Sequence, residues 1–210
     1  MISHVTAYDD VGAPWRVAVD QAWESFVAGS LGIGAVITDA SGAIVSAGRN
    51  RITESTGPAG HLFGGRLAHA EMDALAGLPG DNEPDLVLWT TLEPCLLCAG
   101  GIVLCEIRDV RYAASDPLWF GAERLSDLNE FLASRWPERT GPVDGALATF
   151  GALLPLLWFL RTRGEDGIVA RTYARDDPQL LDHARAHART AAELAADHAS
   201  ARDAFATLAG

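Results

Sequence analysis

The chain has 210 residues, of which 49% are hydrophobic and 21% are charged, a composition typical of a globular protein and not of a disordered or collagen-like one. A chain of this length holds about one to one and a half domains and can bury a core without disulfides. Its net charge is −12, and the acidic residues are spread along the chain. Because proteins bind nucleic-acid backbones with clustered cations, this composition disfavours a nucleic acid as the main partner, although it allows a single nucleotide.

Targeting signals are absent from the sequence pattern. Residues 1–10 have no basic region followed by an apolar one, so no signal peptide is expected. The most apolar stretch, residues 145–160, contains Pro155 and is shorter than the about 20 residues that span a bilayer. The sequence therefore predicts a cytoplasmic protein with no membrane partner.

The first half of the chain alternates between helical and strand patterns. In chain order the predicted elements are a helix over 14–28, strands over 33–38 and 43–47, a helix over 67–78, a strand over 86–91, a helix over 95–107 and a strand over 110–114. The two strands at the start form a hairpin with one antiparallel pair, and strands separated by helices are expected to be parallel neighbours. This order predicts an α/β fold with a mixed central sheet and helices on its faces.

Beyond residue 116 the signals are helical. The candidates are residues 123–136, residues 146–160 with a kink or an end at Pro155, and a stripe of apolar residues over 178–208. We therefore divide the chain into a core over residues 1–140 and a helical C-terminal extension over residues 141–210. The extension is expected to pack on the core or on a neighbouring subunit.

Two short motifs carry the chemistry. Cys95 and Cys98 are three residues apart at the start of a predicted helix, so both sulfurs lie on one face of its first turn. Free backbone N–H groups there favour thiolates, which is the form that a metal binds. His69, at the start of another predicted helix, adds a third ligand, and three protein ligands are typical of a catalytic zinc site whose fourth position holds water.

Glu71 distinguishes a catalytic from a structural zinc site, because a structural site needs a fourth Cys or His and no neighbouring carboxylate. Zinc lowers the pKa of its bound water to about 7, and a nearby glutamate can take that proton and deliver it onward. The set predicts hydrolytic loss of ammonia from an amidine-like ring carbon, through a zinc-bound hydroxide with Glu71 as proton shuttle.

The H-x-E and P-C-x-x-C motifs resemble those of the cytidine deaminase superfamily of zinc-dependent base and nucleoside deaminases. Residues 91–101 (TLEPCLLCAGG) are most similar to the branch of guanine deaminases and tRNA adenosine deaminases. The resemblance covers about half of the chain and implies a cytidine deaminase-like fold, a three-layer α/β/α arrangement with a mixed central sheet. It implies that Zn²⁺ is held by His69, Cys95 and Cys98, with Glu71 as general acid and base.

The resemblance also points to substrate contacts. Asn50, at the end of the second strand, matches the base-contacting asparagine of the branch, with a turn asparagine as the alternative. Ala70, between a ligand and the glutamate, is a second candidate. Asp116 and Trp119 follow the fourth strand, where a carboxylate could accept ring N–H groups and an aromatic ring could stack on a base or pack in the core. The glycine-rich loop over residues 53–66 is either a lid or a surface insertion.

The sequence thus predicts a zinc-dependent hydrolytic deaminase of a free nucleobase or nucleoside. A purine such as guanine, guanosine or adenosine is favoured by the branch. A cytosine or cytidine deaminase, a tRNA adenosine deaminase and a non-catalytic zinc-binding protein are the alternatives. By analogy with the superfamily we expect a homodimer, for which the apolar helix over residues 146–160 is a candidate interface.

Overall fold

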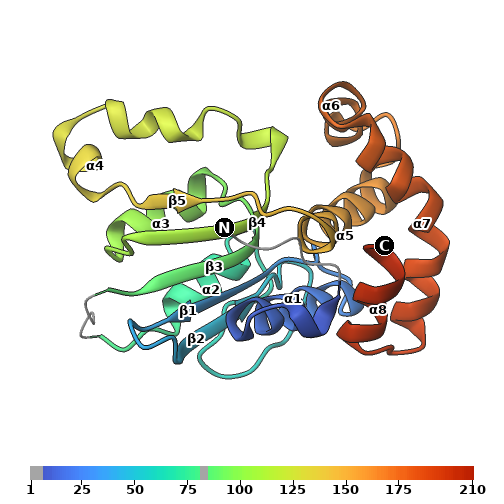
Figure 1. Ribbon diagram of the computed structural model, residues 1–210, viewed down its shortest axis with the longest axis horizontal. Helices are drawn as coiled ribbons and strands as arrows, with labels where there is room; N and C mark the ends of the chain where they lie inside the picture. Colours follow the sequence, from blue (N-terminus) through green and yellow to red (C-terminus); the bar gives the residue numbers. More distant parts are fainter. Residues whose placement is uncertain (1–6, 81–84) are drawn as a thin grey trace.

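A five-stranded mixed sheet organises the fold (Figure 1), and the computed structural model describes residues 7–80 and 85–210. The strands are β1 (Gly34–Thr38), β2 (Ile44–Arg49), β3 (Val87–Leu92), β4 (Asp109–Ala114) and β5 (Glu138–Thr140). They lie in the order β2-β1-β3-β4-β5, with β1 antiparallel to both of its neighbours and β3, β4 and β5 mutually parallel.

The hairpin of β1 and β2 is confirmed, and the Asp39 carboxylate stabilises its turn by accepting hydrogen bonds from the Ser41 and Ala43 amides at 2.8 and 3.0 Å. The prediction of one antiparallel pair was wrong, because β1 is also antiparallel to β3. The connection from β2 to β3 crosses over β1, so these two strands are parallel to each other without being neighbours.

Helices cover both faces of the sheet. The first three are α1 (Ala13–Val27), α2 (Ala70–Ala76) and α3 (Leu96–Leu104). Ile37 and Leu88 point to the face covered by α2 and α3, where they share one buried cluster with Ala74. On the other face Trp15 of α1 meets Trp89 of β3 edge to face, with ring centroids 5.2 Å apart. The predicted three-layer α/β/α fold is confirmed.

The remaining elements follow β4. They are the short helices η2 (Pro117–Trp119), η3 (Ala122–Asp127) and α4 (Glu130–Arg135), then α5 (Ala146–Arg163), α6 (Ile168–Asp176), α7 (Pro178–Ala196) and α8 (Ala201–Leu208), while η1 (Tyr8–Asp10) precedes α1. Figure 1 shows α5 to α8 gathered at one end of the molecule. The chain boundary that we placed at residue 140 stays a prediction.

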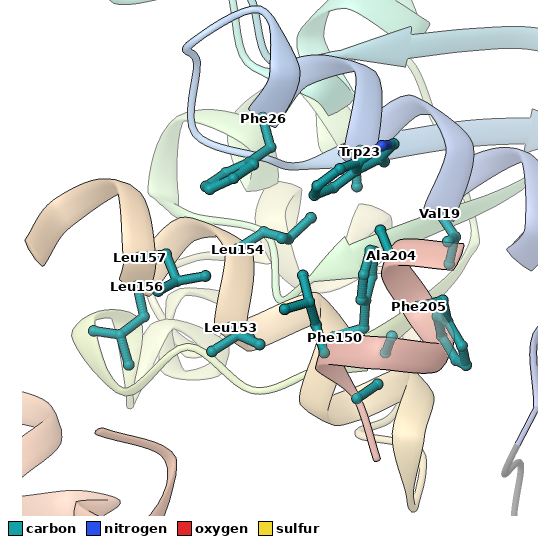
Figure 2. Close-up of a cluster of buried hydrophobic side chains, with 14 of the residues drawn as sticks. Val19, Trp23, Phe26, Phe150, Leu153, Leu154, Leu156, Leu157, Ala204 and Phe205 are labelled. Carbon is teal, nitrogen blue, oxygen red and sulfur yellow. The ribbon is translucent and has the colours of Figure 1, made fainter. Parts of the chain in front are cut away.

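Large apolar side chains join these helices to α1 (Figure 2). Leu154 of α5 lies in one buried cluster with Trp23 and Phe26 of α1. Phe150 of α5 contacts Phe205 of α8, with ring centroids 5.2 Å apart. Burial of this apolar surface holds the C-terminal helices on α1 of the same chain.

Three helix predictions need correction. The helix expected over residues 123–136 is broken between η3 and α4, where the Asn129 side chain caps the new helix. The stripe over residues 178–208 forms two helices, because the Ser200 hydroxyl accepts from the Asp203 amide and starts α8. Helix α5 does not end at Pro155, since the surrounding apolar contacts of the buried helix offset the missing N–H. Helix α6 and strand β5 were not predicted.

The apolar sequence of α5 suggested a subunit interface, and in the structure most of this helix is covered within the chain. Ten of its residues, from Leu147 to Trp158, are buried within this chain. Gly151 lies so close to β3 that an added Cβ would be 2.1 Å from the Thr91 carbonyl oxygen. The apolar face of α5 is therefore covered by its own chain.

Within the described ranges, none of the helices combines the length and apolar character needed to cross a bilayer. The prediction that no signal peptide is present concerns residues 1–10, of which residues 1–6 lie outside the described part of the chain.

Candidate functional site

Two helix starts bring the predicted ligands together. His69 is the residue before α2, Cys95 is the residue before α3, and Cys98 lies in the first turn of α3. His69 Nδ1 is 3.5 Å from each sulfur, and the two sulfurs are 3.5 Å apart. The three ligand atoms therefore form a small triangle, the arrangement that a metal ion requires.

The triangle fits zinc. Nitrogen and sulfur ligands at about 2.0–2.3 Å from a tetrahedral zinc are separated by about 3.6–3.8 Å, close to the distances observed. A hydrogen bond from Cys98, above all, lowers the pKa of Cys95 to about 4, so one thiolate is already favoured. The matching hydrogen bond raises the pKa of Cys98 well above its usual value. One histidine and two cysteines, with no fourth Cys or His beside them among the described residues, are the donor set of an open site.

Glu71 lies against this triangle. Its side chain comes from the first turn of α2, and the residue is only 4% exposed. Its Oε2 is 3.3 Å from Cys98 Sγ, and its Oε1 accepts a hydrogen bond from the Thr90 hydroxyl at 3.4 Å. Burial raises the pKa of Glu71. A carboxyl group with a raised pKa beside a metal site is suited to moving protons near neutral pH.

Asn50 follows β2 and is fully buried. Its backbone is fixed on both sides, because its amide donates to the Ile33 carbonyl at 2.9 Å and its carbonyl accepts from the Ser25 hydroxyl at 2.7 Å. Its Oδ1 accepts from the Ile52 amide at 3.3 Å. Its Nδ2 is buried and has no hydrogen-bond partner among the residues that the structure describes. A buried donor left free in this way can serve a ligand.

Asp73, which the sequence analysis did not single out, holds the loop after Asn50 in place. Its carboxylate accepts hydrogen bonds from the Leu62 amide at 2.7 Å and the Arg49 amide at 3.2 Å. His61 Nδ1 lies 3.1 Å from the same carboxylate. The loop over residues 53–66 is thus attached to α2, the helix that begins at the metal site.

Asp116 and Trp119 share one turn after β4. Asp116 is 6% exposed, its carboxylate accepts from the Leu118 amide at 3.0 Å, and burial raises its pKa to about 6. The Trp119 amide donates to the Asp116 carbonyl at 3.0 Å, and its side chain is partly exposed. Ala70 is fully buried as the first residue of α2. The structure therefore brings the three ligands and Glu71 into contact and leaves Asp116 and Trp119 in a separate turn.

One signal could have revealed Asp73. Helix α2 reads as a short apolar helix, and Asp73 lies four residues after His69, on the same face. A carboxylate among buried alanines and leucines needs hydrogen-bond partners, so a loop or an arginine should have been expected beside it.

The family model described as the cytidine and deoxycytidylate deaminase zinc-binding region matches residues 13–114, a range that includes all three ligands. A tRNA-specific adenosine deaminase from Streptococcus pyogenes serotype M18 is 34% identical over 115 residues, which are 53% of this chain and 67% of that protein. A cytosine deaminase from Candida albicans is 37% identical over 99 residues, which are 45% of this chain and 60% of that protein. The chain spans between 20% and 67% of the length of such curated relatives.

A crystal structure of a protein in complex with 2,6-diaminopurine shares the fold. The two structures superpose with a TM-score of 0.50 at 19% identity, covering 79% of this chain and 86% of the other.

Proposed function

Because the chain belongs to the cytidine and deoxycytidylate deaminase family, whose zinc-binding region it carries, we propose that it is a hydrolytic deaminase of a free nucleobase or nucleoside. The observation that carries the proposal is the buried carboxylate of Glu71, 3.3 Å from one sulfur of the metal-ligand triangle. A structural zinc site has no use for this carboxylate, so a non-catalytic zinc-binding protein is disfavoured.

The metal site and Glu71 would have different roles in the reaction. His69, Cys95 and Cys98 would hold a zinc ion, which when bound lowers the pKa of water to about 7 and so supplies a nucleophile at neutral pH. Glu71 would accept a proton from the attacking water and pass it to the ring nitrogen beside the amine-bearing carbon. It would then carry the second proton to the amine, so that a C–O bond forms, the C–N bond breaks and ammonia leaves.

Asn50 would orient the ring. Its free Nδ2 can donate to a ring carbonyl or ring nitrogen, and its fixed backbone prevents it from turning away. Ala70, Asp116 and Trp119 remain proposed substrate contacts, with the Asp116 carboxylate as an acceptor of ring N–H groups and the Trp119 ring as a stacking surface.

We favour a purine such as guanine, guanosine or adenosine, because residues 91–101 are most similar to the purine-acting branch. Cytosine or cytidine is the alternative that the Candida albicans relative supports. A tRNA adenosine deaminase is a second candidate because relatives at 34% identity carry that name. The net charge of −12 argues against it, since RNA binding depends on clustered cations.

Two further parts of the proposal concern the cellular location and the oligomeric state of the protein. Its three free cysteines suit a reducing cytoplasm. A homodimer remains an expectation by analogy, with an interface other than the buried face of α5.

The test is ammonia release by the zinc-loaded protein from guanine, guanosine, adenine, adenosine, cytosine and cytidine. The wild type should convert one or a few of them, and Glu71→Gln should lower kcat by about 10²–10⁴-fold with the zinc content unchanged. Glu130→Gln, the same change at an exposed position, is the control and should leave the rate unaltered.

Zinc-loaded protein that is inactive on the whole panel would contradict the proposal. A tRNA anticodon arm, assayed at two salt concentrations, then tests the second candidate, since phosphate contacts make RNA binding fall steeply with salt.

A further inference from the structure

A cavity of about 890 Å³ lies between the sheet and the C-terminal helices. The sheet side contributes Glu93 and Asp116. The helical side contributes Tyr173 of α6, Asp177 at the cap of α7 and His183 of α7. Its size falls within the range of about 300–1,000 Å³ that is typical of small-molecule sites, and it exceeds what a nucleobase alone would fill. The family match ends at residue 114, so the helical wall is a feature of this chain outside that match.

The cavity wall is linked to the metal site through the chain, because Glu93 lines the cavity and lies two residues before Cys95. Leu92 of β3 and Ala114 of β4 are paired at the carboxyl ends of these parallel strands, and Cys95 lies three residues after the end of β3. Glu93, which lies between them, donates its amide to the Ala114 carbonyl at 2.8 Å, and its Oε2 accepts from the Asp116 amide at 3.1 Å. Ligands of α/β proteins bind beyond the carboxyl ends of parallel strands, which is where this cavity opens.

The charges that act on Asp116 also link the cavity to the metal site. Burial is the main cause of the raised pKa of Asp116, and the negative charges of Glu93, Cys95 and Glu71 add to it. Asp116 thus lines the cavity and is influenced by the charges of Cys95 and Glu71.

The lining is rich in hydrogen-bond acceptors. Besides Asp116 and Asp177 it includes the carboxylates of Glu123 and Asp176, and none of the cavity-lining residues in the described ranges is an arginine or lysine. Arg139, which does not line the cavity, forms an ion pair with Glu93 at 2.7 Å, so the negative charge of Glu93 is balanced. Asp176 is paired with Arg175 at 2.6 Å, so an anionic group entering the cavity would meet the negative charges of Asp116, Asp177 and Glu123.

Tyr173 gives an independent sign of a ligand. The residue is 4% exposed, lines the cavity, and its hydroxyl has no hydrogen-bond partner among the residues that the structure describes. It shares the cavity wall with Asp116 and Asp177, and burial together with their negative charges raises its pKa. The hydroxyl faces the cavity and can donate or accept a hydrogen bond with a group bound there.

We propose that this cavity is the outer part of the substrate site and that it binds the ribose of an unphosphorylated nucleoside. Ribose hydroxyls would donate to the carboxylates of Asp116 and Asp177 and hydrogen-bond with the Tyr173 hydroxyl. A 5′-phosphate would be repelled by the same carboxylates. The inference rests on the proposed deaminase function and selects, within it, nucleosides over free bases and over nucleotides.

Conservative variants of the helical wall test the inference. Tyr173→Phe removes only the hydroxyl. Asp177→Asn removes the charge and keeps the side-chain cap of α7, because asparagine caps helices as well as aspartate does. Asp182→Asn, the same change on the exposed side of α7 and outside the cavity, is the matched control.

The readout is kcat/KM for guanosine, adenosine and cytidine, for their bases and for their 5′-monophosphates. The best nucleoside should exceed its base and its monophosphate by at least about tenfold, the size of effect expected for one or two hydrogen bonds. Tyr173→Phe should raise KM for the nucleoside about 3- to 10-fold without changing the rate on the base. Asp177→Asn should lower the ratio of kcat/KM for the nucleoside to kcat/KM for its monophosphate about tenfold. Asp182→Asn should give the same ratio as the wild type.

A base used as well as its nucleoside, with neither cavity variant changing either rate, would overturn the inference while the deaminase proposal stands. Calorimetric measurement of the binding of the same ligands to the Glu71→Gln protein tests the ribose site separately from the deaminase activity. Tighter binding of a nucleoside than of its base and monophosphate, weakened by Tyr173→Phe, supports the inference even where no turnover occurs, and the absence of such binding overturns it.

Discussion

The metal-binding end and the helical end of the molecule are held together by different forces. Around the metal site, α2 and α3 lie on an apolar cluster, and hydrogen bonds fix the segments beside the ligands, as the Asp73 carboxylate does for the loop over residues 53–66. At the helical end, large apolar side chains of α1, α5 and α8 pack into one buried cluster. Hydrogen bonds depend on direction and distance, whereas apolar packing depends mainly on the area removed from water.

Because of this difference, we expect the two ends to contribute to different properties of the protein, one to its stability and the other to its chemistry. The helical end should supply most of the free energy of unfolding, and the metal-binding end should set the geometry on which activity depends. Substitutions at the two ends should therefore differ both in the size of their effect and in the property that they change.

The largest effect on stability is expected from Phe150→Ala. Phe150 is fully buried against Phe205, and removing a buried phenyl ring costs about 3–5 kcal/mol of the free energy of unfolding. Urea denaturation followed by circular dichroism measures the change. Phe120→Ala is the control, because Phe120 is 88% exposed and its removal should alter the free energy by less than about 0.5 kcal/mol. Equal stability of the two variants would contradict the statement that apolar packing at the helical end supplies most of the free energy of unfolding.

The same difference explains how much could be predicted from the sequence. His69, Glu71, Cys95 and Cys98 were predicted because the chemistry of an open zinc site demands these residue types at helix starts. In the structure the His69, Cys95 and Cys98 ligand atoms lie 3.5 Å apart, and Glu71 Oε2 lies 3.3 Å from Cys98 Sγ. The sheet and its helices followed from alternating patterns in the first half of the chain.

What could not be predicted depends on contacts between distant residues. The position of β1 between β2 and β3 is set by a crossover that no local pattern encodes. The apolar sequence of α5 indicated burial but not its partner, which is α1 in the same chain rather than another subunit. Tyr173 had no local signal, because its role depends on Asp116 and Asp177 on other elements.

An intermediate effect is expected from Asp73→Asn, which tests the polar end. Asparagine keeps the size of the side chain but removes the charge that faces the Arg49 amide, the Leu62 amide and His61. Hydrogen bonds to a charged group contribute about 1.5–3 kcal/mol, so a loss of about 2 kcal/mol is expected. Because Arg49 precedes Asn50, KM for the substrate should also rise several-fold, and the Leu62 amide should exchange its hydrogen faster.

Asp109→Asn provides the matched control for this substitution. Asp109 pairs with Arg111 at the surface, and a pair of that kind contributes about 0–1 kcal/mol. An Asp73→Asn protein with the stability, KM and Leu62 exchange rate of this control would show that the loop does not depend on Asp73.

The smallest effect is expected at Tyr8, a polar contact placed at the apolar end. Its ring lies edge to face with Phe205, and its hydroxyl donates to Asp20 at 2.5 Å. Burial, followed by this hydrogen bond, raises the pKa of Tyr8 to about 12. Since an unfolded tyrosine has a pKa of about 10, the unfolded chain loses this proton first as the pH rises from 10 to 12. The folded chain then binds more protons than the unfolded one, so the stabilisation is complete below pH 10 and declines above it.

The wild type should therefore exceed Tyr8→Phe in stability by less than about 1 kcal/mol at pH 9, because the group is largely exposed and a single hydrogen bond contributes about this much. This difference should shrink between pH 10 and 12. Tyr112 and Tyr173, whose pKa values are also raised by burial, are present in both proteins, so their effects cancel. Urea midpoints at pH 9, 10 and 11 measure the difference. Equal stability of the two proteins at all three pH values would mean that Tyr8 stabilises the protein only through its ring, which phenylalanine keeps, and that its hydroxyl contributes nothing.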